Sequence, residues 1–128
     1  MRSHLKSLRV NDQGTTAVEF AIVAPVFITL LIGTLALCVA LFLIGSLHYA
    51  AEEGARCASV KTACQVNGMP NGAAIQTYAQ NHYFGPNGPT FTYASAACGN
   101  SVRASINYSM NVGFRTYVIP ISATACFP

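Results

Sequence analysis

The chain has 128 residues, of which 52% are hydrophobic and 9% charged, and its formal net charge is +3. The charged fraction is far below the roughly 25% of ordinary soluble domains, and the length leaves room for one small domain at most. Three of the seven basic residues lie in the first nine positions and the other four are scattered, so the basic stripe of a nucleic-acid-binding domain is missing. These features exclude a nucleic-acid partner and favour a membrane protein.

The segment from Phe20 to Leu47 contains 28 residues without an acidic, basic or histidine side chain. A bilayer core of about 30 Å requires about 20 helical residues at 1.5 Å each, so this segment can span with several residues to spare. The alternative is a buried helix of a soluble protein, but such helices are usually shorter and have a polar face. Basic residues precede the segment and Glu52 and Glu53 follow it. The positive-inside rule therefore predicts a cytoplasmic N-terminus and a C-terminal part outside the cytoplasm.

Four of the five cysteines, Cys57, Cys64, Cys98 and Cys126, follow the predicted span. This is the side on which oxidation is permitted, so they are expected to form two disulfides. Four cysteines allow three pairings, of which we favour Cys57–Cys64 and Cys98–Cys126. Cys38 lies within the span and is interpreted as a small apolar residue.

The apolar helix is expected to continue to about Lys61, with Glu52 paired to Arg56 one turn later, and to end before the breaker cluster at residues 67–70. From Ala73 to His82, apolar side chains recur at three-to-four spacing, which predicts a short amphipathic helix.

Three later segments are rich in β-branched and aromatic residues and are predicted strands: Phe91–Ala97, Val102–Met110 and Phe114–Ile121. Gly99-Asn100 and residues 111–113 are the predicted turns. Apolar residues alternate from Val102 to Met110, and this face is expected to cover the helix above the membrane. The predicted fold class is therefore α+β: a long N-terminal transmembrane helix with a small disulfide-braced head, made of a short helix plus an antiparallel sheet.

Four aromatic residues of the predicted head admit two interpretations. They could form an exposed contact patch or belong to the core of the head, and the core is favoured because a domain this small has few other large apolar side chains. The four are Tyr78, Tyr83, Phe84 and Tyr93.

Glu19 needs an explanation, because it opens an otherwise uncharged apolar helix. A carboxylate at the bilayer centre costs about 2.5–3.5 kcal/mol on insertion scales, and less near the interface. Either the carboxylate is solvated among the headgroups, near the positive helix N-terminus, or a partner satisfies its charge. Position alone leaves both interpretations open.

The residues around Glu19 resemble a known motif. Gly14 is followed by four residues, then Glu19 and Phe20, which looks like the prepilin-peptidase site of type IV pilins and pseudopilins. More narrowly, the stretch from Thr16 to Pro25 (TAVEFAIVAP), with YAAEEGAR at residues 49–56, resembles the TadE-like family of minor pseudopilins of tight-adherence (Tad, type IVc) pilus systems. This resemblance implies a pilin-like fold.

The resemblance also implies a division of the chain and a role for its residues. Residues 1–14 would be a basic leader, residues 15–61 the long helix with a span of about 20–47, and residues 62–128 the exported head. A prepilin peptidase would cut between Gly14 and Thr15, where a glycine lets extended backbone enter a tight cleft. Glu19 would then pair with the new α-ammonium of Thr15 during assembly. Phe20 and Pro25 belong to the same assembly segment, and Pro25 is expected to kink or loosen the helix.

The partners that the resemblance implies are the prepilin peptidase, other pilin and pseudopilin subunits, an inner-membrane assembly platform and membrane lipid. The implied location is the inner membrane, with the head in the periplasm before assembly and in an extracellular pilus after it. The predicted function is that of a minor pseudopilin in pilus biogenesis and surface attachment.

An enzyme is not expected. Residues 62–128 contain no aspartate or glutamate, and His48 and His82 have no catalytic motif around them, so no catalytic residue and no cofactor is predicted. A metal site of Cys57, Cys64 and His82 is conceivable but matches no standard zinc spacing. The main rival to the pseudopilin is an uncleaved single-pass anchor that displays a partner-binding domain outside the cytoplasm.

Overall fold

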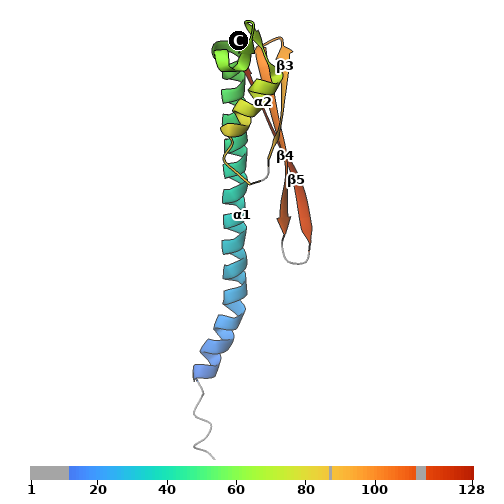
Figure 1. The fold of residues 1–128 in the computed structure, drawn as a ribbon. Coiled ribbons are helices and arrows are strands. Elements are labelled where there is room, and N and C mark those ends of the chain that lie inside the picture. Colours follow the sequence, from blue (N-terminus) through green and yellow to red (C-terminus); the bar gives the residue numbers. More distant parts are fainter. Residues whose placement is uncertain (1–11, 87, 112–114) are drawn as a thin grey trace, which may run out of the picture. The chain divides into compact units, whose positions relative to one another are not determined.

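The computed structural model describes residues 12–86, 88–111 and 115–128 (Figure 1). The basic residues of the predicted leader and most of the turn predicted at 111–113 lie outside these ranges. The chain forms two compact units, Met1–Val39 and Ala40–Pro128. One helix, α1, contributes to both.

Helix α1 covers 49 residues, Asp12–Val60, and therefore begins before the predicted boundary at Thr15. In the first unit almost all of its side chains are exposed, although most are apolar. A helix can carry such a surface into lipid because its backbone hydrogen bonds are all internal. By length and composition α1 is a helix that could span a membrane, as the sequence predicts.

In the second unit the same helix buries a stripe of side chains. The stripe begins at Leu43 and recurs at intervals of three and four residues, which is the period of one helix face. After Leu47 its members are mostly small. The buried residues are Leu43, Ser46, Leu47, Ala50, Ala51, Gly54, Ala55, Cys57 and Ala58.

After Val60 the chain makes a short 3-10 helix, η2 (Thr62–Cys64), and a hairpin of strands β1 (Gln65–Val66) and β2 (Met69–Pro70). Asn67 and Gly68 join these strands with φ of 54° and 79°, the left-handed backbone that a two-residue Asn-Gly hairpin turn requires. The sequence predicted only that the helix ends before residues 67–70. Two-residue strands carry too little periodicity to be recognised in advance.

Helix α2 spans Gly72–Asn81, within one residue of the prediction at each end. Asn71 caps it: its Oδ1 accepts hydrogen bonds from the amides of Ala73 and Ala74, at 3.0 and 3.2 Å. Ile75 and Ala79 are fully buried. The amphipathic helix expected from the sequence is therefore present.

Strands β3 (Thr90–Ala96), β4 (Gly99–Asn111) and β5 (Thr116–Phe127) form an antiparallel sheet in the order β3-β4-β5. The predicted end of the third strand at Ile121 is wrong, because β5 continues through small residues that pair with the first half of β4. The turn predicted at Gly99-Asn100 is also displaced: Ala97 and Cys98 form it, and Gly99 opens β4 with φ of 115°. Pairing with β4 overrides the weak local signals.

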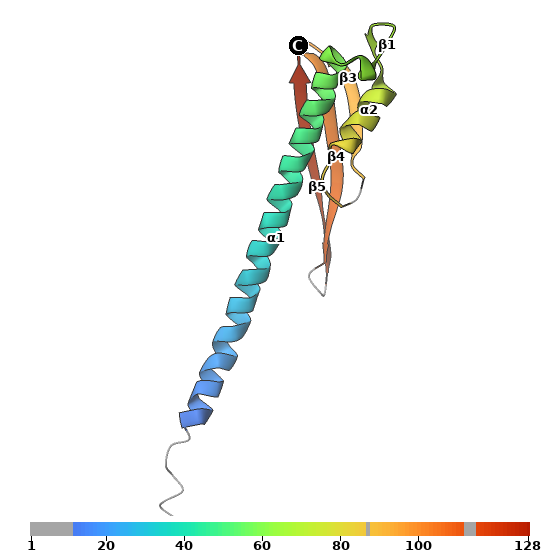
Figure 2. The same ribbon diagram turned by 60° about the vertical axis from the view of Figure 1, so that its left-hand side comes forward.

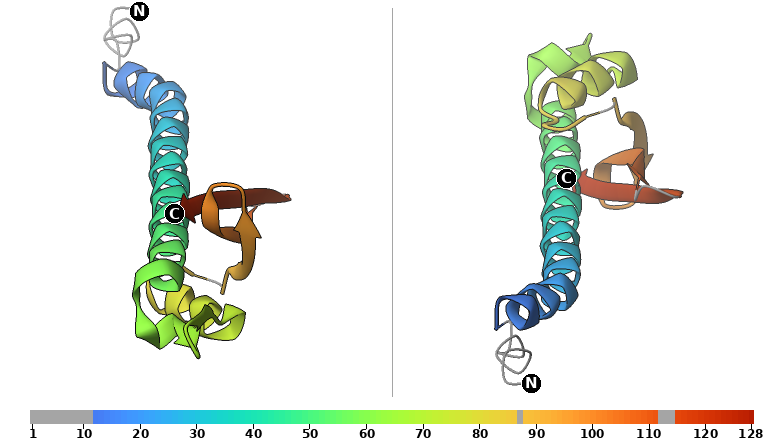
Figure 3. Two further views of the ribbon diagram at one scale, coloured as in Figure 1. Left: turned by 90° about the horizontal axis from the view of Figure 1, so that it is seen from above. Right: turned by 90° about the horizontal axis from the view of Figure 1, so that it is seen from below.

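The sheet covers α1 through one face of β4. Val102 and Ala104 are fully buried and Ile106 nearly so, as the alternation predicts. Gly54 permits this contact: a Cβ added there would lie 3.1 Å from the Ala79 Cβ and 3.5 Å from Val102. Figure 2 shows α2 and the sheet beside the upper part of α1, and both views in Figure 3 place them on the same side of it. The second unit is thus the predicted small α+β head, and the fold class is confirmed.

Candidate functional site

Gly14 and Thr15, the predicted processing residues, lie in the first turn of α1. Both are exposed, and a Cβ added at Gly14 would meet nothing within 4 Å. The backbone here is helical, so it would have to unwind to enter a peptidase cleft in extended form. The first four amides of a helix have no acceptor within it, and glycine costs about 1 kcal/mol relative to alanine in a helix. This turn therefore unwinds at a lower cost than the interior of α1.

Glu19 and Phe20 are both exposed on α1, Phe20 by 73%. Glu19 is four residues after Thr15, so the two lie on the same face one turn apart. Side chains on a helix lean toward its N-terminus, which directs the Glu19 carboxylate to the turn that Thr15 occupies. Within the described part of this single chain, no ion pair involves Glu19. Its carboxylate is accessible to a cation.

Pro25 lies inside α1 and does not end it. Proline has no amide hydrogen, so the helix lacks one internal hydrogen bond there. The axis of α1 bends in the blue part of Figure 1, the part that contains this proline. One turn later, the Thr29 hydroxyl donates to the Pro25 carbonyl at 2.7 Å. Thr34 likewise donates to Leu31 at 2.8 Å, so both hydroxyls are satisfied inside the helix, as lipid requires.

The segment Tyr49–Arg56, predicted to continue the apolar helix, has a structural role in the head. Its small residues face the core, whereas Tyr49, Glu52 and Arg56 are exposed. Small side chains at three-to-four spacing let α2 and β4 approach the helix closely, as the contacts around Gly54 show. The periodicity of alanine and glycine was the available signal for this packing surface.

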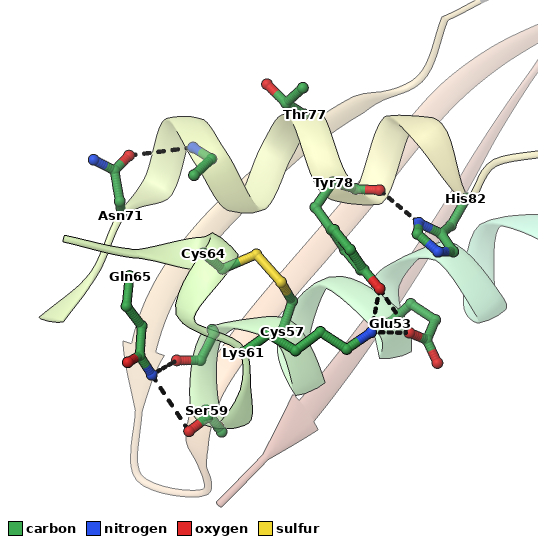
Figure 4. Close-up of a disulfide and its surroundings, with 12 residues drawn as sticks. Glu53, Cys57, Ser59, Lys61, Cys64, Gln65, Asn71, Thr77, Tyr78 and His82 are labelled. Carbon is green, nitrogen blue, oxygen red and sulfur yellow. Dashed lines mark hydrogen bonds and ion pairs between the residues drawn. A yellow bond between two sulfur atoms is a disulfide. The ribbon is translucent and has the colours of Figure 1, made fainter. Parts of the chain in front are cut away.

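The expected pair of Glu52 with Arg56 is not the ion pair that forms. Among the described residues the salt bridge joins Lys61 Nζ to Glu53 Oε2 at 3.4 Å (Figure 4). Lys61 also donates to the Tyr78 hydroxyl on α2, and the Tyr78 and His82 rings stack with centroids 4.3 Å apart. The hydrogen bond to Tyr78 raises the pKa of Lys61 above its usual value. Desolvation lowers this pKa by less than the Tyr78 bond raises it, and the hydrogen bond to Glu53 raises it further. This cluster ties the end of α1 to α2.

Two disulfides brace the head, Cys57–Cys64 and Cys98–Cys126. They are the two pairs that the sequence analysis favoured. The first bridge joins α1 to η2 (Figure 4), and the second joins the turn before β4 to the end of β5. The metal site considered for Cys57, Cys64 and His82 is therefore wrong, because the bridge consumes both thiols. Cys38 is free and exposed on α1.

Three of the four head aromatics pack against the core, as interpreted: Tyr78, Tyr83 and Tyr93 are half-buried. Burial raises the pKa of the Tyr83 hydroxyl. For Phe84 the interpretation is wrong, since its side chain is 60% exposed and stacks near the Tyr49 ring at 6.3 Å between centroids. Its amide donates to Ser46 Oγ at 2.7 Å, which fixes the loop after α2 against α1.

Comparison with known proteins connects these features. The family model of TadE-like proteins matches residues 14–56. The matched segment begins at Gly14, includes Glu19, Phe20 and Pro25, and ends with the small-residue packing surface at Arg56. No curated protein and no solved structure matches the chain. The resemblance seen in the sequence is thus confirmed over residues 14–56, and it is a resemblance to TadE-like proteins.

Proposed function

We propose that this protein is a minor pseudopilin of a tight-adherence pilus, a structural subunit that takes part in pilus biogenesis and in attachment to surfaces. The observation that carries the proposal is Glu19: an exposed carboxylate in an otherwise uncharged apolar helix, inside the segment that matches TadE-like proteins. A carboxylate that enters an apolar environment between packed helices is costly unless a partner pairs with it.

The first step is removal of residues 1–14 by a prepilin peptidase. The peptide bond between Gly14 and Thr15 lies in the terminal turn of α1, where unwinding sacrifices few hydrogen bonds. Gly14 has open space around it, so a peptidase cleft meets no side chain there. Cleavage leaves a helix that starts with an α-ammonium group at Thr15.

The second step is pairing of this ammonium with Glu19. The two groups are one turn apart on one helix face, and the apolar helix around them offers no competing charge from Phe20 to Leu47. Between packed subunits the same carboxylate would accept the ammonium of a neighbour. A buried charge that needs one particular partner fixes the register of packed helices, because any other alignment leaves it unpaired.

The location follows from α1. We place Thr15 at the cytoplasmic side of the inner membrane and the head in the periplasm, because basic residues precede the apolar segment and the disulfides follow it. The proposed partners are the prepilin peptidase, other pilin and pseudopilin subunits, the inner-membrane assembly platform and lipid. After assembly the head would be in the extracellular pilus.

The experiment combines intact-mass spectrometry of the protein from native membranes with a matched pair of variants. We expect a chain that begins at Thr15 and is lighter by the mass of residues 1–14. Glu19→Ala should insert and be cleaved but fail to restore pili in a strain that lacks the protein. Glu52→Ala, which removes an exposed acid from the same helix after the span, should restore them.

The rival is an uncleaved anchor that displays a partner-binding head, and the helical backbone at Gly14 is the observation that favours it. A mature chain that still begins with the leader would support the anchor and refute processing. A processed Glu19→Ala protein that restores normal piliation would leave processing intact but remove the assembly role of the carboxylate.

A further inference from the structure

Strands β4 and β5 extend beyond the rest of the head. β3 pairs only with residues 99–105 of β4, whereas the β4–β5 ladder continues to the pair Asn111↔Thr116. Residues 106–111 and 116–121 therefore form a two-stranded distal ribbon with no third strand. Figure 1 shows this ribbon projecting past α2 and β3.

The ribbon projects toward the end of the head at which α1 enters it. Asn100, at the start of β4, donates to Ser59 Oγ at 2.8 Å, and Val102 lies against Gly54. The strand therefore runs along the helix toward lower residue numbers. From Val102 to Asn111 it covers up to about 30 Å at 3.3 Å per residue, whereas the helix from Gly54 to Ala40 covers about 21 Å. The ribbon is therefore long enough to reach the level of Ala40, the first residue of α1 in the second unit.

The side chains of the ribbon are unusually apolar for an exposed hairpin. Ile106 faces Ile121, Tyr108 faces Ile119 and Met110 faces Tyr117, all on the continuation of the face that covers α1. Tyr117 is 49% exposed and Ile119 41%, and Val118 on the opposite face is 61% exposed. Exposed hairpins normally carry polar or charged residues that oppose aggregation. The opposite face is mostly polar, with Val118 and Pro120 among Asn107, Ser109 and Thr116, so the ribbon is amphipathic, as suits the boundary between an apolar and a polar medium.

The charge of the ribbon and of the rest of the head supports a lipid surface as the medium around the ribbon. Residues 62–128 contain no acidic residue, and Arg115 is exposed immediately before β5, at the tip of the ribbon. Tyrosine, aliphatic and arginine side chains together are the composition of membrane–water interfaces, and arginine is attracted to anionic lipid headgroups. The outer edges of a two-stranded ribbon have unpaired backbone groups, which excludes the hydrocarbon core but not the hydrated headgroup zone.

We propose that the distal ribbon lies in the headgroup region of an anionic bilayer, the same bilayer that α1 spans, and holds the head close to that surface. The proposal rests on the membrane span in the proposed function. Removal of the subunit from the membrane then requires the ribbon to leave the lipid as well as α1.

Tryptophan fluorescence tests this proposal, because the chain contains no tryptophan and each substitution gives a single probe. The full-length protein is reconstituted in anionic vesicles, with and without lipids brominated near the upper or the lower end of the acyl chains. Tyr117→Trp probes the ribbon. Val66→Trp probes the β1–β2 hairpin, where the side chain is 53% exposed, and Leu35→Trp probes the span.

We expect the Tyr117→Trp emission to be blue-shifted and quenched most by bromine near the headgroups, and the Leu35→Trp emission to be quenched most by the deeper bromine. Val66→Trp should stay unquenched. Adding Arg115→Glu to Tyr117→Trp should reduce the quenching in anionic vesicles.

An unquenched Tyr117→Trp beside a quenched Leu35→Trp overturns the ribbon proposal and leaves the span intact. If its emission is blue-shifted only at high protein-to-lipid ratios, a second copy of the chain covers the ribbon, which also overturns it. An unquenched Leu35→Trp refutes the span itself.

Discussion

Helix α1 has two parts that differ both in composition and in structure. Residues 14–42 are exposed almost all round, whereas from Leu43 to Ala58 one face is buried under α2 and the sheet. The first part has large apolar residues on all sides. The second has a stripe of mostly small residues, with polar residues such as Glu52 and Arg56 on the opposite face. The same helix therefore presents a lipid-type surface first and a protein-type surface after it.

The difference shortens the membrane-facing segment. Sequence alone predicts a span from Phe20 to Leu47, but Leu43 and Leu47 are fully buried in the head. The segment from Phe20 to Phe42 still provides about 35 Å at 1.5 Å per residue, enough for a bilayer core of about 30 Å. The last turn of the apolar run is thus the beginning of the head core.

The largest difference in stability between the two parts should come from replacing one leucine in each part with alanine. Leu47→Ala removes a fully buried side chain and should lower the free energy of unfolding of the head by about 2–5 kcal/mol. Leu35→Ala removes one that is 66% exposed and should leave the stability of the head unchanged. Near-ultraviolet circular dichroism during urea unfolding in detergent measures both. Equal effects would mean that the two parts of α1 are not distinct.

The first part of α1 was easy to predict and the second was not. An apolar run of this length without charges is typical of a segment surrounded by lipid. A helix that could span a membrane was therefore predictable from residues 20–47 without knowledge of its neighbours. The packing surface from Ala50 to Ala58 depends on which strand and helix lie opposite. The sequence therefore predicted that the alternating face from Val102 would cover the helix, but not which helix residues would lie under it.

The disulfides brace only the second part, and their loss should be the next largest effect. Removing Cys98 and Cys126 together opens a loop of 28 residues and should cost about 3.5 kcal/mol by loop entropy, whereas the bridge from Cys57 to Cys64 closes 7 residues and should contribute about 2.5 kcal/mol. Urea midpoints of the two double serine variants give this order. The reverse order would show that anchoring η2 to α1 matters more than closing the sheet.

The predictions that the structure contradicts failed for a common physical reason: long-range contacts decided the outcome. β5 runs on to Phe127 through residues with little strand signal, because each of them pairs with β4. The salt bridge found among the described residues joins Lys61 to Glu53, not the predicted Glu52 to Arg56, and α2 brings Tyr78 to the same lysine. In the candidate site, a sequence motif identified Gly14, Glu19 and Pro25. The motif did not predict that the backbone at Gly14 is helical, because that depends on where α1 begins.

A third comparison uses two glycines of α1. Gly54→Val places a Cβ 3.1 Å from the Ala79 Cβ and should destabilise the head by about 1–3 kcal/mol through overpacking. Gly45→Val is the matched control, because a Cβ there meets nothing within 4 Å. Thermal unfolding followed by the aromatic signal distinguishes them. A stable Gly54→Val protein would show that α2 can move away from α1 without loss.

The smallest effect concerns Lys61, which joins the two helices of the head through Glu53 and Tyr78. Its pKa is raised in the folded state, so the folded protein holds this proton more tightly than the unfolded chain does. The stabilisation is therefore fully present below the usual lysine pKa of 10.5 and is lost as the pH rises through the higher folded value. Tyr83 changes stability in the same direction, because burial raises its pKa too.

The variant that separates the two groups is Lys61→Met, whose unbranched side chain is one atom shorter than that of lysine and carries no charge. We expect the wild-type melting temperature to fall more steeply than that of Lys61→Met above about pH 10.5, since the variant keeps the contribution of Tyr83 but lacks that of Lys61. Below that pH the difference between the two proteins should be constant. Parallel slopes across the whole range would mean that the Lys61 ammonium is solvated in the folded head and that α2 is held to α1 by apolar packing alone.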